Sequence, residues 1–350
     1  LVISCPCALV VSIPLGFFGG IGGASKRGIL VKGSNYLEAL NNVETVVFDK
    51  TGTLTKGVFE VVNINSQIDF TNEDLIEYAA FAESHSSHPI ALSILKVYNK
   101  DVDITKIEDY EEIAGHGILA KVGGKEILAG NSKLMNKENI KYQEVETLGT
   151  IVHVAVDKKY AGNIVISDAV KEDSADAIKG LKALGVRNTV MLTGDSKAVG
   201  EKIATQLGID KVYTELLPAD KVEKIEALDA KKSQKGKIVF VGDGINDAPV
   251  LARADIGMAM GGLGSDAAIE AADIVIMTDE PSKIVTAIKV AKRTRKIVMQ
   301  NIVFALAVKA IFLALGAVGV ATMWEAVFAD VGVTVVAVLN AMRVMNTKSI

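Results

Sequence analysis

The sequence has few cysteines, few aromatic residues and little excess of either charge. Of its 350 residues two are cysteines, Cys5 and Cys7, and 5% are aromatic. So few cysteines exclude a small secreted domain that disulfides hold together. The net charge is −4, and no stretch of basic residues alternates with aromatic ones. We therefore do not expect nucleic acid as a partner.

Charged residues are also nearly absent from three long apolar runs, residues 1–25, 302–324 and 326–342. The only charged residues in these runs are Lys309 and Asp330, although the whole chain has 38 basic and 42 acidic residues. A bilayer core needs a helix of about 20 apolar residues, so each run is long enough, or nearly so, to span a membrane. The alternative is that they are core helices of a large soluble protein.

The first run differs from the other two in its prolines and glycines. It contains Pro6, Pro14 and five glycines, which predict a kinked or partly unwound helix supported by neighbours that this chain does not contain. The run begins at Leu1 without a positively charged lead-in, unlike a signal peptide. We therefore expect the chain to be a fragment of a longer protein.

Basic residues beside the apolar runs predict the orientation in the membrane. Lys26 and Arg27 follow the first run, six basic residues between positions 283 and 296 precede the second, and Arg343 follows the third. By the positive-inside rule, the central region should be cytoplasmic and the protein a multi-pass protein of the cell membrane. The last two runs should form a hairpin with its outer connection near Gly319 to Glu325.

The central region alternates between strand-like and helical patterns. Such alternation favours an α/β fold with a doubly wound sheet, whose ligands lie beyond the carboxyl ends of the strands. The expected strands are residues 43–48, 189–192, 237–241 and 274–277, and the expected helices are residues 171–184, 197–207 and 219–230.

Residues 57–164 interrupt this alternation and predict an inserted α+β domain. Helical patterns cover residues 72–83 and 89–99, and turns at Gly123-Gly124 and Asp157-Lys158 predict two hairpins. The expected domains are therefore a membrane helix at 1–25, a discontinuous α/β domain at 26–56 and 165–280, the insert at 57–164, and a stalk with two membrane helices at 281–345.

Polar residues suited to phosphoryl transfer follow the predicted strands. Asp49 ends the first strand and precedes a glycine-containing turn, so it could attack phosphorus if cations mask the charge repulsion. Thr193 supplies a hydroxyl, Lys221 an ammonium, and Asp243 and Asp247 carboxylates for magnesium. The alternative is that these carboxylates only cap helices and strand ends, and Asp195 is a candidate for such capping.

These motifs resemble the haloacid dehalogenase superfamily and, more narrowly, the P-type ATPases. Asp49 to Thr55 matches the phosphorylation motif of that family, and Gly242 to Pro249 matches its hinge motif. The resemblance implies ATP and magnesium as cofactors and Asp49 as the phosphorylated nucleophile. It further implies that Asp49, Thr51 and Asp243 hold magnesium, that Thr193 and Lys221 contact phosphate, and that Asp247 supports the metal site.

The residue at position 51 bears on the alternative of a membrane-anchored phosphatase. Soluble phosphatases of the superfamily have a second aspartate two positions after the nucleophile, as a general acid and base. This chain has Thr51 there, which cannot relay a proton near neutral pH. The aspartyl phosphate should therefore be long-lived, which favours a pump.

The inserted domain resembles the nucleotide-binding domain of heavy-metal-transporting P-type ATPases. His85, His116 and His153 are not part of this resemblance, and a lone Gly-x-Gly or His-Pro usually marks only a turn or a helix start. The resemblance implies that six residues surround adenosine: Glu83, His88, Gly115, Gly117, Gly130 and Asn131.

The Cys5-Pro6-Cys7 motif predicts a membrane site for a soft metal ion. Proline frees backbone carbonyls, and two thiolates favour soft ions, whereas a disulfide between cysteines two positions apart would be strained. Lys309 and Asp330 are costly in lipid unless they pair or bind an ion, although Lys309 could instead reach the interface. Exporters of zinc, cadmium and lead in the resembling family have a matching Lys and Asp.

The chain contains no Thr-Gly-Glu motif. We therefore expect the actuator domain and further helices to lie in an upstream part of the protein. The sequence thus predicts the C-terminal part of a P-type ATPase that exports zinc, cadmium or lead. The alternatives are the membrane-anchored phosphatase and a non-catalytic metal-binding membrane protein.

Overall fold

The computed structural model divides the chain into two compact units. One unit is Thr55–Val170, and the other combines the chain up to Leu54 with the chain from Lys171 onward. The expected insert was 57–164, but strand β3 begins at Thr55 and strand β8 extends to Val170, so the insert is longer at both ends. The structure describes residues 7–86, 88–113, 115–143, 149–243, 247–261, 266–320 and 322–345.

The larger unit contains a seven-stranded sheet in the order β1-β13-β12-β11-β2-β9-β10. Its strands pair in parallel except β1, which pairs antiparallel with β13 at one edge. The expected doubly wound α/β sheet is therefore confirmed. The strands are β1 (Ile29–Val31), β2 (Val43–Asp49), β9 (Asn188–Leu192), β10 (Lys211–Tyr213), β11 (Lys237–Gly242), β12 (Ile256–Met260) and β13 (Ile274–Ile276).

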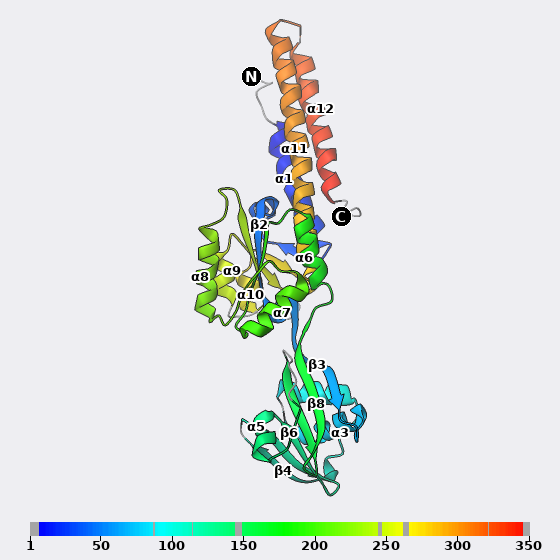
Figure 1. The fold of residues 1–350 in the computed structure, drawn as a ribbon. Helices are drawn as coiled ribbons and strands as arrows, with labels where there is room; N and C mark the ends of the chain where they lie inside the picture. Colours follow the sequence, from blue (N-terminus) through cyan, green and yellow to red (C-terminus); the bar gives the residue numbers. More distant parts are fainter. Residues whose placement is uncertain are drawn as a thin grey trace. The chain divides into compact units, whose positions relative to one another are not determined.

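Helices cover both faces of this sheet. Ile225 of α8, Val250 of α9 and Ala268 of α10 share one core cluster with Val47 and Phe240 of the central strands. Figure 1 shows α6 and α7 on the opposite side of the sheet. The helices of this domain are α2 (Ser34–Ala39), α6 (Ser174–Ala183), α7 (Lys197–Leu207), α8 (Pro218–Asp229), α9 (Ala248–Arg253) and α10 (Asp266–Ala271).

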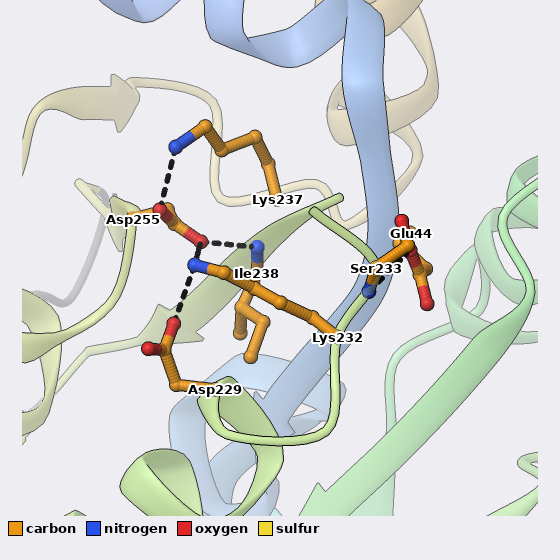
Figure 2. Close-up of polar contacts among 7 residues, drawn as sticks. All are labelled: Glu44, Asp229, Lys232, Ser233, Lys237, Ile238 and Asp255. Carbon is orange, nitrogen blue, oxygen red and sulfur yellow. Dashed lines mark hydrogen bonds and ion pairs between the residues drawn. The ribbon is translucent and has the colours of Figure 1, made fainter. Parts of the chain in front are cut away.

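Ion pairs hold the end of the sheet where the central strands begin (Figure 2). Asp255 accepts hydrogen bonds from Lys232 at 2.6 Å, from Lys237 at 2.8 Å and from the backbone N–H of Ile238 at 2.9 Å. The hydroxyl of Ser233 donates to Glu44, near the start of β2. These contacts fix the loop before β11 at the end of the sheet opposite Asp49.

Three helices of the described residues are long and apolar enough to cross a membrane: α1 (Cys7–Ser25), α11 (Ser282–Ala317) and α12 (Met323–Met342). Helix α11 ends at Ala317, and Gly319 in the following turn has φ +76°. The connection between α11 and α12 therefore begins at Val318, slightly before its expected position, and α12 begins at Met323.

The first apolar run was expected to be kinked or partly unwound and supported by neighbours outside this chain; its described residues, 7–25, are not unwound. Helix α1 is continuous through Pro14 and packs against α11 and α12 of the same chain. Its glycines allow this close approach, since a Cβ on Gly16 would lie 2.8 Å from Val298 and one on Gly20 would lie 2.5 Å from Thr294 Oγ1.

The smaller unit is a six-stranded antiparallel sheet in the order β3-β8-β7-β6-β5-β4, with α3 and α4 packed into its main core. Both predicted hairpin turns are confirmed, at Gly123-Gly124 and at Asp157-Lys158, all with positive φ. Its elements are β3 (Thr55–Ser66), α3 (Asn72–Glu83), α4 (Pro89–Tyr98), β4 (Ile107–Ile113), β5 (Gly117–Val122), β6 (Lys125–Gly130), α5 (Ser132–Lys137), β7 (Thr150–Val156) and β8 (Lys159–Val170).

Candidate active site

Asp49 is the last residue of the central strand β2 and is 6% exposed. The loop Lys50–Leu54 follows it, with Gly52 at φ +71°. A Cβ on Gly52 would lie 1.6 Å from Oδ2 of Asp243, so this position has no room for a side chain. The loop therefore passes directly against the end of β11.

Lys221, in the first turn of α8, is the cation of the site. Its Nζ atom lies 2.5 Å from Oδ1 of Asp49 and 2.8 Å from Oδ1 of Asp247. Burial alone would lower the pKa of Lys221, but the two carboxylates outweigh burial and raise it. Lys221 therefore stays charged and bridges the two aspartates.

Asp49, Asp243 and Asp247 form a cluster that could hold a divalent cation. Each offers a carboxylate oxygen, and these oxygens lie within 4.8 Å of one another. Hard cations such as magnesium prefer oxygen ligands, so the cluster fits the expected magnesium site. The middle of the predicted hinge motif, residues 244–246, lies outside the described residues.

The cluster carries more negative charge than Lys221 neutralises. Burial raises the pKa of Asp49 to about 7, and the charge of Asp247 adds to this effect while Lys221 opposes it. Burial, together with Asp247, raises the pKa of Asp243 to about 6. A bound divalent cation would favour the ionised forms, and an ionised Asp49 is what nucleophilic attack requires.

Thr193 follows β9, the strand beside β2. Asp49 pairs with Leu192 in the sheet register, so the buried Thr193 is the next residue beyond the level of Asp49. Its hydroxyl accepts a hydrogen bond from the backbone N–H of Asp195 at 3.1 Å. Asp195, for which the sequence left a capping role open, is not the N-cap of α7, because Ser196 holds that position; Asp195 forms an ion pair with Lys50 at 2.8 Å.

Lys171, which no sequence pattern indicated as a site residue, contacts the loop after Asp49. Lys171 is 8% exposed, and its Nζ donates to the carbonyl of Gly52 at 2.6 Å and to Asp279 at 2.9 Å. The partners lie 119 and 108 positions away in the sequence, so no local pattern indicates these contacts.

In the smaller unit, several of the predicted nucleotide-binding residues lie together. Gly117 and Gly130 pair across β5 and β6, and a Cβ on Gly117 would lie 2.3 Å from the carbonyl oxygen of Ala129, while one on Gly130 would lie 2.3 Å from that of His116. The side chain of Asn131 donates to the carbonyl of Gly115 at 2.9 Å. These four residues thus form one close-packed backbone corner.

The other two nucleotide-binding candidates are at helix ends. His88 is the N-cap of α4, and its Nδ1 accepts from the N–H of Ile90 at 3.2 Å. Glu83 ends α3, and burial, with a smaller effect of the Glu112 charge, raises its pKa to about 7. Ser87 and Ala114, beside these candidates, lie outside the described residues.

The two charged residues of the predicted membrane site, Lys309 and Asp330, lie on α11 and α12. Lys309 and Asp330, together with Ala8 and Leu9 of α1, line a partly open cavity of about 210 Å³ between the three helices. Cys5 lies outside the described residues. Cys7 is the first residue of α1 and is in a disulfide here, a state that its spacing from Cys5 made unfavourable. Metal binding by its sulfur would therefore require reduction first.

Comparisons with known proteins agree with this geometry. The family of haloacid dehalogenase-like hydrolases matches residues 43–255. The chain is 68% identical to a cadmium, zinc and cobalt-transporting ATPase of Bacillus subtilis, over 100% of this chain and 50% of that protein. It is 59% identical to a zinc-transporting ATPase of Synechocystis, over 98% of this chain and 48% of that protein. The chain therefore spans about half the length of these relatives.

Two solved structures are also similar. A zinc-transporting PIB-type ATPase in its E2.Pi state matches with a TM-score of 0.86 at 35% identity, over 98% of this chain and 57% of that chain. The catalytic domain of the CPx-ATPase CopB-B matches with a TM-score of 0.56 at 30% identity, over 76% of this chain and 97% of that domain. On this combined evidence, the chain belongs to the haloacid dehalogenase-like hydrolases and, within them, to the P-type ATPases of the PIB or CPx group.

Proposed function

We propose that this chain is part of an ATP-driven exporter of soft divalent metal ions that is phosphorylated on Asp49. The observation that carries the proposal is the contact of Lys221 with both Asp49 and Asp247, beside a third carboxylate, Asp243. This arrangement combines a buried nucleophile, a fixed cation and a site for magnesium at one end of a parallel sheet.

The proposed step is phosphoryl transfer from ATP. A carboxylate oxygen of Asp49 forms a bond to the γ-phosphorus while the bond from that phosphorus to the β,γ-bridging oxygen breaks, and ADP leaves. Lys221 and the hydroxyl of Thr193 would hold the transferred phosphoryl oxygens. Magnesium, held by Asp49, Asp243 and the Thr51 backbone, would neutralise phosphate charge when bound. Asp247 would keep Lys221 in place through its 2.8 Å contact.

The proposed nucleotide site is in the smaller unit. Glu83, His88, Gly115, Gly117, Gly130 and Asn131 would surround adenosine there. The corner that Gly115, Gly117, Gly130 and Asn131 form supports this site, because four of the six candidates lie together there.

The proposed cargo is zinc, cadmium or lead, bound by the thiolates of Cys5 and Cys7 and by Asp330, with Lys309 pairing nearby. The cavity that contains Lys309 and Asp330 supports this assignment, as do relatives whose names include cadmium and zinc. One of these names also includes cobalt, so cobalt belongs in any panel of metals tested. The protein would lie in the cell membrane with both catalytic units on the cytoplasmic side.

The function is tested by incubating the full-length parent with labelled ATP and with a generic phosphate ester. A pump forms an acid-stable phosphoprotein that hydroxylamine cleaves and that Asp49→Asn does not form. A phosphatase turns over the ester instead, and a metal-binding protein without catalytic activity does neither. Steady ester hydrolysis without a labelled protein would replace this proposal with the phosphatase.

A further inference from the structure

The short segment that follows β8, residues 171–174, holds the loop after Asp49 by three hydrogen bonds. The ammonium of Lys171 donates to the carbonyl of Gly52 at 2.6 Å. The backbone N–H of Lys171 donates to the carbonyl of Leu54 at 3.0 Å, and the hydroxyl of Ser174 donates to the same carbonyl at 2.8 Å. Residues outside this loop therefore fix the path of Lys50–Leu54, which we call the phosphorylation loop.

The same segment also holds the beginning of α11. The ammonium of Lys171 contacts Asp279 at 2.9 Å, in the turn between β13 and α11, where Asp279 has φ +57°. Asp173 accepts from the N–H of Ser282, the first residue of α11, at 2.8 Å. Helix α6, which begins at Ser174, then packs against α11, since a Cβ on Gly180 would lie 2.9 Å from Val285.

The side chain of Lys171 is buried, so its charge depends on the two contacts that the protein provides. A lysine that is 8% exposed must have partners for its charge, and here one partner is a loop carbonyl and the other a carboxylate that is 23% exposed. Movement of α11 relative to the sheet would displace Asp279. Because Lys171 contacts both Asp279 and the carbonyl of Gly52, the peptide of Gly52 would be displaced as well. That peptide lies against Asp243, where a side chain on Gly52 could not fit.

We propose that Lys171 is a positioning residue that holds the phosphorylation loop for metal and phosphate binding and links it, through Asp279, to the start of the membrane helix α11. This inference rests on the proposed function. It adds a physical connection between the membrane site and the loop that follows Asp49. Lys309 of the membrane site is on α11, and the start of α11 is linked to that loop through Asp279 and Lys171.

The test uses the purified full-length parent and two measurements. The first is the magnesium concentration that gives half of the thermal stabilisation by beryllium fluoride, a phosphate mimic that requires no ATP. Lys171→Met should raise this concentration about tenfold, because it removes a hydrogen bond that supports the loop after Asp49, which lies beside the proposed magnesium ligands. Lys171→Arg should bring it back to within about threefold of the wild type, because Arg can donate to both partners.

The second measurement is labelling of the protein by ATP with and without the transported metal. Lys171→Met should slow labelling about 100-fold, as expected for a displaced loop. Asp279→Asn keeps the left-handed backbone and the size of the side chain but removes its charge. It should still be labelled, while the stimulation of labelling by the transported metal falls about fivefold.

Lys182→Met is a matched control, since Lys182 also bridges a carbonyl, that of Gly208, and a carboxylate, that of Asp210, but on the exposed surface. Equal shifts in Lys182→Met and Lys171→Met would overturn the proposal, as would an unchanged magnesium requirement in folded Lys171→Met. Unchanged metal stimulation in Asp279→Asn would overturn the link to α11. If the wild type itself were not labelled by ATP, the proposed function would fail, whereas the beryllium fluoride titration would still decide the role of Lys171.

Discussion

The Nζ atom of Lys221 lies 2.5 Å from Oδ1 of Asp49. The two residues are 172 positions apart in the sequence and come from the first turn of α8 and the end of β2. Because both are largely buried, the contact is little weakened by solvent. The candidate nucleophile therefore has a cation in place before any phosphate arrives.

The first prediction concerns this cation. Lys221→Met should slow phosphorylation by ATP about 100-fold, because it removes a charge that stabilises the transferring phosphoryl oxygens. Rapid acid quenching of labelled protein measures the rate. Lys224→Met, on the same helix but over the ring of Tyr213, is the control and should leave the rate within about twofold of the wild type. Equal loss in both variants would argue against a specific role for Lys221.

The second prediction concerns the nucleophile. Asp49→Asn should abolish labelling by ATP and leave nucleotide affinity within about threefold of the wild type, because the predicted adenosine site is in the other unit. Titration calorimetry with a non-hydrolysable ATP analogue measures the affinity. A labelled Asp49→Asn protein would remove Asp49 from the proposed reaction.

The sequence predicted the main sheet because its central strands are short, mostly apolar runs bounded by polar turns. Val47 and Phe240 are fully buried, as such runs lead one to expect. Strand β3 was missed because its apolar residues do not alternate clearly, and three of them, Val58, Phe59 and Val62, are exposed by 41–53%. The short edge strand β1 also lacks a local signal.

The candidate site was partly predictable for a related reason. Asp49 and Asp243 end or follow parallel strands, so the topology brings them to one edge of the sheet, and the structure places them together. Their chemical roles stay predictions. Lys171 could not be predicted, because its position after β8 gives no sign that its side chain returns to the loop at Gly52.

The third prediction concerns the stability of the smaller unit. The pKa of Glu83 is raised to about 7 by burial and by Glu112, so the folded unit keeps a proton that the unfolded chain loses above its ordinary pKa. The free energy of unfolding should therefore fall by about 1–3 kcal/mol as the pH rises from about 4.5 to about 7. Glu83→Gln should remove this loss.

Urea unfolding at pH 5 and pH 8, followed by hydrogen exchange at amides of the smaller unit alone, measures the effect of Glu83, because Asp49 and Asp243 in the other unit also have raised pKa values. Glu73→Gln, at an exposed position in the first turn of the same helix, should keep the pH dependence of the wild type. If Glu83→Gln retained that dependence as well, a different group would have to bind the proton.

The fourth prediction concerns the ion pairs in Figure 2. Asp255→Asn should lower the free energy of unfolding by about 1–3 kcal/mol, because Lys232 and Lys237 would lose their shared carboxylate. Burial alone would raise the pKa of Asp255, but hydrogen bonds from both lysines outweigh it and lower the pKa. This stabilisation is therefore present near neutral pH and is lost as the pH falls through the lowered pKa.

Glu226→Gln is the control for Asp255, because the ion pair of Glu226 with Arg253 is half exposed. Its effect on the free energy of unfolding should stay below about 1 kcal/mol. Chemical denaturation at pH 7 and pH 4 separates the two variants. A cost for Asp255→Asn no larger than that for Glu226→Gln would show that the cluster contributes little.

The last prediction concerns metal selectivity in the full-length parent. Two thiolates favour soft or borderline ions, a carboxylate favours divalent over monovalent charge, and Lys309 in the same cavity should disfavour a second cation. Zinc, cadmium or lead should therefore stimulate ATP hydrolysis when a reductant keeps Cys7 reduced, and magnesium alone should not. Cys5→Ser, Cys7→Ser and Asp330→Ala should each lose the stimulation.

Glu325→Gln is the control for the membrane site, because Glu325 is exposed at the start of α12, where it accepts from the N–H of Thr322. It should keep the stimulation within about twofold of the wild type. Phosphate release across a panel of zinc, cadmium, lead, cobalt and monovalent copper is the measurement. If monovalent copper activated best and Asp330→Ala left that activation unchanged, the carboxylate would not be a ligand and the cargo would not be a divalent ion.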